Sequence, residues 1–155
     1  MTLTVGDKAP AFSLPDQDGT IHTLAECAGK WTLLYFYPKD ATPGCTVEAQ
    51  ALRDSFSDFS TLNAVVFGIS ADSVESHKKF ADKQNLPFTL LSDTEKSMVQ
   101  AYGVWGKKKM MGREYDGIFR TSFLVAPDGT IAKIYEGVKP SEHAVEVLND
   151  VKAHA

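Results

Sequence analysis

The chain has 155 residues, of which 43% are hydrophobic and 23% charged, and its formal net charge is −4 at pH 7. These values predict a soluble chain of one globular domain, residues 1–155, and give no reason to expect a nucleic acid or an anionic membrane as partner. The first residues, MTLTVGDKAP, lack the features of a signal peptide, and the longest dense apolar stretch, residues 31–37, is too short to span a bilayer. We therefore expect a cytoplasmic protein.

The first half of the chain predicts a hairpin followed by a βαβ unit. An Asp-Gly pair at 18–19 stands between AFSLPDQ and TIHTL, which is a strong hairpin signal. Residues 31–37 form a continuous aromatic and aliphatic run, as in a central strand, and NAVVFGIS at 63–70 is a second buried strand. Between these strands, a helix starting near Thr46 is indicated by apolar residues at spacings of three to five, namely Val47, Leu52, Phe56, Phe59 and Leu62.

The second half continues the alternation of helices and strands. Asp72 and Asp93 are expected to cap the helices SVESHKKFADKQ and TEKSMVQAY, with Gly103 ending the latter and FTLLS forming a short strand between them. RTSFLVA and TIAKIYEG flank a second Asp-Gly pair, at 128–129, and predict another hairpin. A final helix from Ser141 carries one apolar face, formed by Val145, Leu148 and Val151. The sum is an α/β domain with a central mixed β-sheet flanked by helices.

One region lies outside this scheme. Residues 105–117, WGKKKMMGREYDG, show no clear periodicity and are interpreted as a long surface loop. Its run of lysines, Lys107, Lys108 and Lys109, is most simply a solvated stretch, because charge runs are usually exposed surface.

The stretch YPKDATPGCTVEAQ, residues 37–50, presents a cysteine directly after a loop with two prolines and a glycine. If this loop is only a turn, Cys45 is a small buried hydrophobe. However, the pattern places Cys45 in the first turn of a helix, where unpaired N–H groups and the positive end of the helix dipole favour a thiolate. Cys45 is therefore a candidate nucleophile.

Two polar residues can complete such a site. Thr42, on the same loop, can direct a hydroxyl at a substrate atom beside the sulfur, and Arg120, at the start of RTSFLVA, can supply a cation. Local sequence fits equally well with Thr42 as a turn residue that bonds its own backbone and with Arg120 as a surface salt-bridge residue. The residues alone leave both alternatives open.

A family resemblance bears on this choice. FYPKDATPGCTVE resembles the active-site signature of the peroxiredoxins, in which Pro38, Thr42 and Cys45 match a pattern of Pro, three residues, Thr, two residues and Cys. The chain resembles the bacterioferritin comigratory protein (PrxQ) subgroup over essentially its whole length. The segments that carry this similarity are GDKAPAFSLPDQDG, YGVWGKKKMMGREYDGIFRTSFLV and DGTIAKIYEGV.

The resemblance implies a thioredoxin-like fold and a monomeric, thiol-dependent peroxidase that reduces hydroperoxides without a metal or an organic cofactor. It implies that Cys45 is the peroxidatic cysteine, which attacks the peroxide and becomes a sulfenic acid. Thr42 and Arg120 then orient the peroxide and polarise its O–O bond, and Pro38 shields the sulfur from bulk water. Glu48, one helical turn further, fits both a partner of Arg120 and a solvated acid.

The chain departs from its subgroup at the resolving cysteine, which commonly lies five residues after the peroxidatic one. That position is Gln50 here, and the only other thiol is Cys27. The strand at 31–37 separates the two cysteines by about 20 Å, whereas a disulfide needs Cα atoms within about 7 Å, so Cys27 is interpreted as a packing residue. We expect a one-cysteine cycle whose reductant is external, either a small thiol such as glutathione or a thioredoxin or glutaredoxin.

Other functions have weaker support in the sequence. A disulfide oxidoreductase needs a CxxC pair, but the positions three residues from Cys45 are Thr42 and Glu48. A non-catalytic thioredoxin-like interaction or chaperone module stays open, but it leaves the joint presence of Thr42, Cys45 and Arg120 unexplained. A metal site is not indicated, because the histidines are scattered without ligand-like spacing, at His22, His77, His143 and His154.

Overall fold

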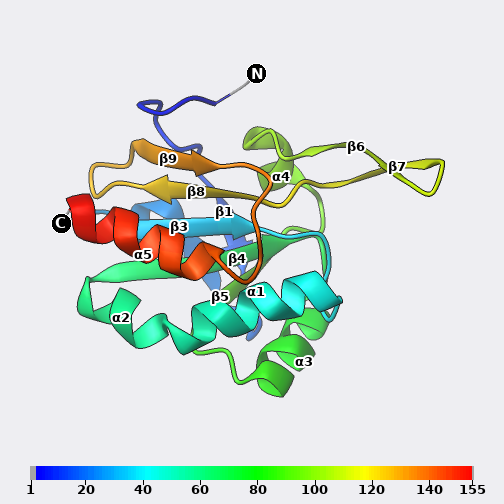
Figure 1. Cartoon of the computed structure of the whole chain (residues 1–155), viewed down its shortest axis with the longest axis horizontal. Coiled ribbons are helices and arrows are strands. Elements are labelled where there is room, and N and C mark those ends of the chain that lie inside the picture. The colour runs from blue at the N-terminus through cyan, green and yellow to red at the C-terminus, as the bar shows by residue number, and fades with distance from the viewer. Residues whose placement is uncertain (1–2, 155) are drawn as a thin grey trace.

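A five-stranded mixed sheet forms the centre of the computed structural model, which describes residues 3–154 (Figure 1). Its strand order is β5-β4-β3-β8-β9. Strands β3, β4 and β5 are parallel, whereas β8 is antiparallel to both β3 and β9. This arrangement confirms the predicted mixed sheet and βαβ unit. The strands are β3 (Trp31–Phe36), β4 (Ala64–Ser70), β5 (Thr89–Ser92), β8 (Thr121–Val125) and β9 (Ile131–Tyr135).

Each face of the sheet buries its own apolar cluster. Because side chains alternate along a strand, β3 contributes Leu33 and Tyr35 to one cluster and Leu34 and Phe36 to the other. The first cluster lies under α1 (Pro43–Asp54), α2 (Phe56–Thr61), α3 (Val74–Gln84) and α5 (His143–His154). The second packs against η1, a 3₁₀-helix at Leu24–Cys27, and α4 (Ser97–Ala101). None of the helices in the described residues is long and apolar enough to cross a membrane.

Both predicted Asp-Gly hairpins are present. The N-terminal hairpin pairs β1 (Ser13–Pro15) with β2 (Ile21–Thr23), and Gly19 between them has a φ of +82°. The second joins β8 to β9 through Gly129, whose φ is +88°. Glycine adopts this left-handed conformation without steric cost, which is why the Asp-Gly signal located both turns.

The helix predicted from near Thr46 to Leu62 is wrong in two respects. It begins earlier, at Pro43, because proline is favoured in the first turn of a helix. It is also two helices, since the backbone turns at Ser55, whose φ and ψ are −100° and 2°, before α2 starts. Two residues assigned to apolar faces are in fact exposed, Val47 at 42% and Val145 at 59%.

The two predicted aspartate caps are also wrong. The N-cap of α3 is Ser73, whose hydroxyl accepts a hydrogen bond from the Ser76 N–H. The Asp72 carboxylate instead accepts hydrogen bonds from the Asp40 N–H and the Ser70 hydroxyl. The N-cap position of α4 is held by Lys96, although the Asp93 carboxylate does accept the Val99 N–H within that helix. As expected, α4 ends just before Gly103.

The segment predicted as a surface loop is a β-hairpin. Strands β6 (Trp105–Met110) and β7 (Arg113–Ile118) pair antiparallel and project from the body of the molecule (Figure 1). The prediction failed because both faces of this hairpin carry polar residues, so no apolar alternation marks the strands. Its turn also has positive φ at Met111 and Gly112, of +52° and +80°, and methionine is not a residue that signals such a turn.

Candidate active site

The loop between β3 and α1 presents Cys45 inside the protein. Ala41 lies in this loop with a φ of +63°, and Thr42 then occupies the N-cap position of α1 in an extended conformation. Cys45 is the third residue of the helix, as its predicted place in the first turn requires, and is 1% exposed. The Thr42 side chain makes no capping hydrogen bond. The N–H groups of the first turn point toward the N-terminal end of α1, where Cys45 lies. The Thr42 side chain does not occupy them.

Arg120, which lies 75 positions after Cys45 in the sequence, places a positive charge beside the sulfur. It lies just before β8, and its Nη2 donates to Cys45 Sγ at 3.2 Å. Its Nη1 donates to Glu48 Oε1 at 2.7 Å, one helical turn beyond Cys45. The planar guanidinium thus contacts the thiol and the carboxylate at once, with one nitrogen for each. The sequence left open whether Arg120 is a cation beside Cys45 or a surface residue, and whether Glu48 is a partner of Arg120 or a solvated acid. The structure favours the first alternative for both residues.

Gly44 leaves the space that the Arg120 side chain occupies. A Cβ atom placed on Gly44 would lie 3.1 Å from Arg120 Nη2, closer than ordinary van der Waals contact. A side chain at this position would require the guanidinium to shift by a few tenths of an ångström. Glycine in the first turn of α1 therefore leaves room for the Arg120–Cys45 contact.

Glu48 is an unusual carboxyl group, because it is 0% exposed. Burial raises its pKa to about 7, although the charge and the hydrogen bond of Arg120 act to lower it. Its second oxygen, Oε2, has no hydrogen-bond partner among the described residues. Near neutral pH this carboxyl group therefore exists in both protonation states, and it is ionised only in part as a partner for Arg120.

The structure places the two other predicted site residues on the same loop without a bond to the sulfur. The Thr42 hydroxyl donates to the Lys39 carbonyl at 2.8 Å, which is the turn interaction that the sequence left open. Since its proton is used there, the hydroxyl oxygen is left as an acceptor. Pro38 is partly buried where the chain leaves β3. The roles of Thr42 and Pro38 toward a substrate stay predictions.

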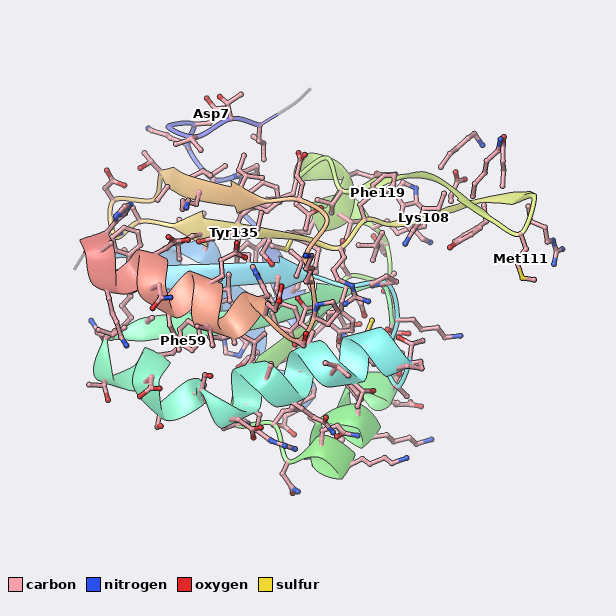
Figure 2. All side chains as sticks on the ribbon, viewed as in Figure 1. Asp7, Phe59, Lys108, Met111, Phe119 and Tyr135 are labelled. Carbon is pink, nitrogen blue, oxygen red and sulfur yellow. The ribbon has the colours of Figure 1, made fainter. Side chains whose placement is uncertain are left out.

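Lys108 lies near the site, although the sequence predicts only a solvated residue at this position. Its neighbours Lys107 and Lys109 are exposed, as expected for a solvated run, but Lys108 is half-buried and its Nζ donates to the Ile118 carbonyl at 2.9 Å. Burial and the charge of Arg120 lower the pKa of Lys108, whereas the charge of Cys45 raises it. Figure 2 shows Lys108 closer to the body of the molecule than Met111, which lies at the far end of the hairpin. No sequence signal separates Lys108 from its two neighbours, because the difference arises from the hairpin fold.

A polar cluster, in which Asp40 and His77 are buried and Asp72 is partly buried, contacts the loop that precedes Cys45. Asp40, Asp72 and His77 offer ligand atoms that lie within 4.8 Å of one another, so these residues could hold a cation. In the structure their atoms are engaged in hydrogen bonds, including His77 Nδ1 to Asp40 Oδ2 at 2.7 Å. Sequence spacing gave no indication of this group, since its members come from three separate segments.

Cys27 lies on the other face of the sheet. It belongs to the apolar cluster beneath η1, whereas Cys45 belongs to the cluster beneath α1. Both cysteines are free, and burial raises the pKa of Cys27. The packing role expected for Cys27 agrees with this position.

Comparison with known proteins identifies the family of the chain. Residues 5–134 match the AhpC/TSA family. The chain is 48% identical over 153 residues to the peroxiredoxin Bcp of Escherichia coli (strain K12), covering 99% of this chain and 98% of the relative. It is 46% identical over 152 residues to the peroxiredoxin Bcp of Bacillus subtilis (strain 168), covering 98% of this chain and 97% of the relative.

Solved structures show the same similarity. A mutant of Xylella fastidiosa PrxQ superimposes with a TM-score of 0.94 at 37% identity, covering 99% of this chain and 98% of the other. The bacterioferritin comigratory protein of Xanthomonas campestris, studied for its alkyl peroxide reduction activity, superimposes with a TM-score of 0.87 at 39% identity, covering 92% of this chain and 91% of the other.

Proposed function

Because the chain belongs to the AhpC/TSA family and is a thiol-dependent peroxidase like its Bcp relatives, we propose that Cys45 is the thiol through which it reduces hydroperoxides. The observation that carries this assignment is the 3.2 Å contact between Arg120 Nη2 and Cys45 Sγ at the start of α1. A cation and a helix N-terminus both favour the thiolate, which is the nucleophilic form of cysteine. Cys27 instead lies at the end of η1, and burial raises its pKa.

The reaction starts when the Cys45 thiolate attacks the distal oxygen of the hydroperoxide. An S–O bond forms and the O–O bond breaks, so the sulfur is oxidised to a sulfenic acid while the peroxide is reduced. The departing hydroxide or alkoxide takes up a proton and leaves as water or an alcohol. Arg120 Nη2 lies where negative charge moves from sulfur to oxygen, so it can stabilise that charge as it develops.

Thr42 and Pro38 have supporting roles in this proposal. The Thr42 oxygen has its proton committed to Lys39, so it accepts a hydrogen bond from the O–H group of a bound hydroperoxide. This fixes which end of the substrate faces the sulfur. Pro38 closes the loop on the side where the chain leaves β3 and limits the access of water.

We further propose a one-cysteine cycle. Gln50 occupies the position of the usual resolving cysteine, and Cys27 packs on the opposite face of the sheet from Cys45. An external thiol then condenses with the sulfenic acid, releasing water and forming a mixed disulfide, and a second thiol releases Cys45 in the reduced form. Thioredoxin, glutaredoxin or a small thiol can supply these electrons.

The same proposal extends to the organisation of the protein. One domain, residues 1–155, is supported by the five-stranded central sheet, each face of which carries one of the two apolar clusters. The free thiols of Cys27 and Cys45 suit a reducing compartment such as the cytoplasm. We propose a monomer, since nothing in the chemistry assigned to Cys45 requires a second copy.

The test is intact and peptide mass spectrometry after one equivalent of hydrogen peroxide. Addition of one oxygen atom at Cys45, trapped by a reagent specific for sulfenic acid, is the expected result. A disulfide between Cys27 and Cys45, or oxidation confined to Cys27, contradicts the proposal. A non-catalytic binding module predicts that neither cysteine reacts faster than a free thiol.

A further inference from the structure

The hairpin β6–β7 is anchored next to the candidate active site. It projects from the body of the molecule, and β7 ends at Ile118, two residues before Arg120 (Figure 1). At this base the Lys108 Nζ donates to the Ile118 carbonyl at 2.9 Å. The Phe119 side chain approaches the hairpin at Gly106, where an added Cβ atom would lie 2.8 Å from the Phe119 ring. These contacts fix the base of the hairpin beside the site.

One side of this hairpin has balanced charges. Because side chains alternate along a strand, residues that pair across the hairpin share a side. Lys107 pairs in register with Asp116, and their charged groups lie 3.7 Å apart. Lys109 is opposite Glu114 on the same side. The positive and negative charges on this side therefore cancel.

The other side is positively charged, and we name it the basic face. Its charged and aromatic residues are Lys108, Arg113 and Tyr115. Both acidic residues of the hairpin, Glu114 and Asp116, lie on the opposite side. Gly117 lets two members of the face approach each other, since a Cβ atom there would lie 3.0 Å from Lys108 Cδ and 3.3 Å from Tyr115 Cε2. The face continues toward the tip, because Arg113 lies two residues from Tyr115, about 7 Å along β7.

The basic face begins at the site and differs in charge from the rest of the protein. Burial has the largest effect on the pKa of Lys108, but Lys108 is also close enough to Arg120 and Cys45 for their charges to act on it. The hairpin carries four basic and two acidic side chains, whereas the whole chain has a net charge of −4. An acidic protein that approaches Cys45 is therefore repelled by the chain as a whole and attracted at the hairpin.

A protein reductant has to cover part of the basic face, whereas a small thiol does not. Weak redox encounters bury less than about 1,200 Å² in total, so each partner contributes a patch of roughly 600 Å², about 14 Å in radius. A patch of this size centred on Cys45 includes Lys108 and Tyr115 and extends toward Arg113. Tyr115 is 41% exposed, and tyrosine is enriched in protein interfaces.

We propose that the basic face, formed by Lys108, Arg113 and Tyr115, is the docking surface for an acidic protein thiol that reduces the oxidised Cys45. This inference rests on the proposed role of Cys45 and adds the chemistry of its reductant, which carries acidic side chains around its reactive cysteine. The face raises the rate of encounter and orients the partner. The electrons still pass at Cys45, by condensation with the sulfenic acid and release of water.

Arg113→Glu and Lys107→Glu form a matched pair of variants for the test. Each reverses one charge at an exposed residue of the same hairpin, but only Arg113 lies on the basic face. The measured quantity is the second-order rate constant for reduction of the oxidised protein by a thioredoxin of acidic sequence. At about 0.1 M salt, where charges act within about 10 Å, Arg113→Glu should lower it about fivefold and Lys107→Glu less than about twofold. At about 1 M salt both variants should approach the wild type.

Two control rates show whether the effect belongs to docking. Hydrogen peroxide and dithiothreitol are small and uncharged, so oxidation by the first and reduction by the second should be unchanged in Arg113→Glu. These rates also establish that the variant is folded. Tyr115→Ala should lower the rate with thioredoxin at low and high salt alike, because it removes contact area rather than charge.

A second measurement needs no peroxide. Titration of the isotope-labelled, reduced protein with reduced thioredoxin should shift the amide resonances of residues 105–118, and Arg113→Glu should weaken this binding. Hairpin resonances that do not move overturn the inference. Equal losses of rate in Arg113→Glu and Lys107→Glu, a loss in Arg113→Glu that persists at high salt, or one that extends to dithiothreitol also overturn it. Because the titration involves no oxidation, it judges the hairpin even if Cys45 proves not to be the reactive thiol.

Discussion

Arg120 donates a hydrogen bond to the sulfur of Cys45 across 75 positions of sequence. The contact joins the first turn of α1 to the residue that precedes β8. It depends on the antiparallel pairing of β8 with β3, which places the start of β8 beside the end of β3, and on Gly44, which leaves room for the guanidinium. The chemistry of the site therefore depends on the register of the sheet as well as on the loop around Cys45.

The first prediction separates the two cysteines. Cys45→Ser should abolish peroxidase activity, because a serine hydroxyl is not ionised at neutral pH and cannot attack the peroxide. Cys27→Ser should keep most of the activity, with some loss of stability because a buried thiol is replaced by a hydroxyl in an apolar cluster. Peroxide consumption with an excess of thiol measures both. Substantial activity in Cys45→Ser refutes the assignment.

The second prediction concerns the shape of the Arg120 side chain. Arg120→Lys keeps the charge but cannot contact Cys45 and Glu48 in the two directions that the guanidinium fork provides. Loss of one charge-assisted hydrogen bond, about 1.5–3 kcal/mol, should lower the rate of reaction with peroxide by roughly ten- to a hundredfold. The deficit should persist at every pH, including values where thiols are ionised. If it disappears at high pH, Arg120 serves only to favour the thiolate.

The sequence predicted the central fold because its signals are local. The Asp-Gly pairs located two hairpins, and the apolar runs located β3 and β4. The hairpin β6–β7 was missed, since its strands are polar on both faces and Met111 at its turn is held in a left-handed conformation by the neighbouring pairing. The aspartate caps failed because Asp72 is used to hold a loop 32 residues away, at the Asp40 N–H. In each case a contact with a distant part of the chain determined the local structure, against the preference of the local sequence.

The residues of the candidate site also fall into those that the local sequence predicts and those that it does not. Cys45 and Thr42 lie in one motif and could be found from sequence, whereas the distinction of Lys108 from Lys107 and Lys109 exists only after the hairpin has formed. Glu48 could be placed one turn from Cys45, but its complete burial could not be anticipated, because its cover comes from elements distant in the chain. The cluster around His77 likewise combines three segments with no common signal.

The third prediction uses the pKa of Glu48. It is raised from 4.5 to about 7 in the folded protein, so between these values the folded state holds a proton that the unfolded state has lost. Stability linked to this group is thus complete below pH 4.5 and is lost as the pH rises to about 7. Relative to Glu48→Gln, the free energy of unfolding of the wild type should fall by about 3 kcal/mol across this range. Urea unfolding at several pH values measures the difference, and a difference independent of pH contradicts it.

The fourth prediction concerns Lys108. Its positive charge lies near Arg120 and Cys45, where it adds to the stabilisation of negative charge on the departing oxygen. Lys108→Gln should lower the rate of reaction with hydrogen peroxide by about three- to tenfold, and Lys108→Arg should restore much of it. Lys109→Gln, in the exposed neighbour, provides the matched control and should have little effect. Equal losses in the Lys108 and Lys109 variants indicate a general effect of charge on the hairpin.

The final prediction follows from Gln50. Its Nε2 donates to Gln84 Oε1 at 2.9 Å, which fastens this part of α1 to α3. In the proposed one-cysteine cycle, the sulfenic acid of Cys45 waits for an external thiol, and a second peroxide can oxidise it irreversibly to the sulfinic acid. The wild type should therefore lose activity during turnover at high peroxide when the reductant is scarce. Loss of activity should parallel the gain of two oxygen atoms at Cys45 by mass spectrometry.

Gln50→Cys places a thiol about one and a half helical turns from Cys45, too far for a disulfide while α1 is intact. The variant also removes the hydrogen bond to Gln84, which makes the first turns of the helix easier to open. If the helix opens within the lifetime of the sulfenic acid, this variant should form an internal disulfide after one equivalent of peroxide and should resist inactivation. Gln50→Ser, which also lacks the amide but has no thiol, is the control and should inactivate like the wild type. A Cys27–Cys45 disulfide that forms rapidly in the wild type would overturn the one-cysteine cycle. It would show that Cys27 acts as the resolving cysteine, although the two thiols are buried on opposite faces of the sheet.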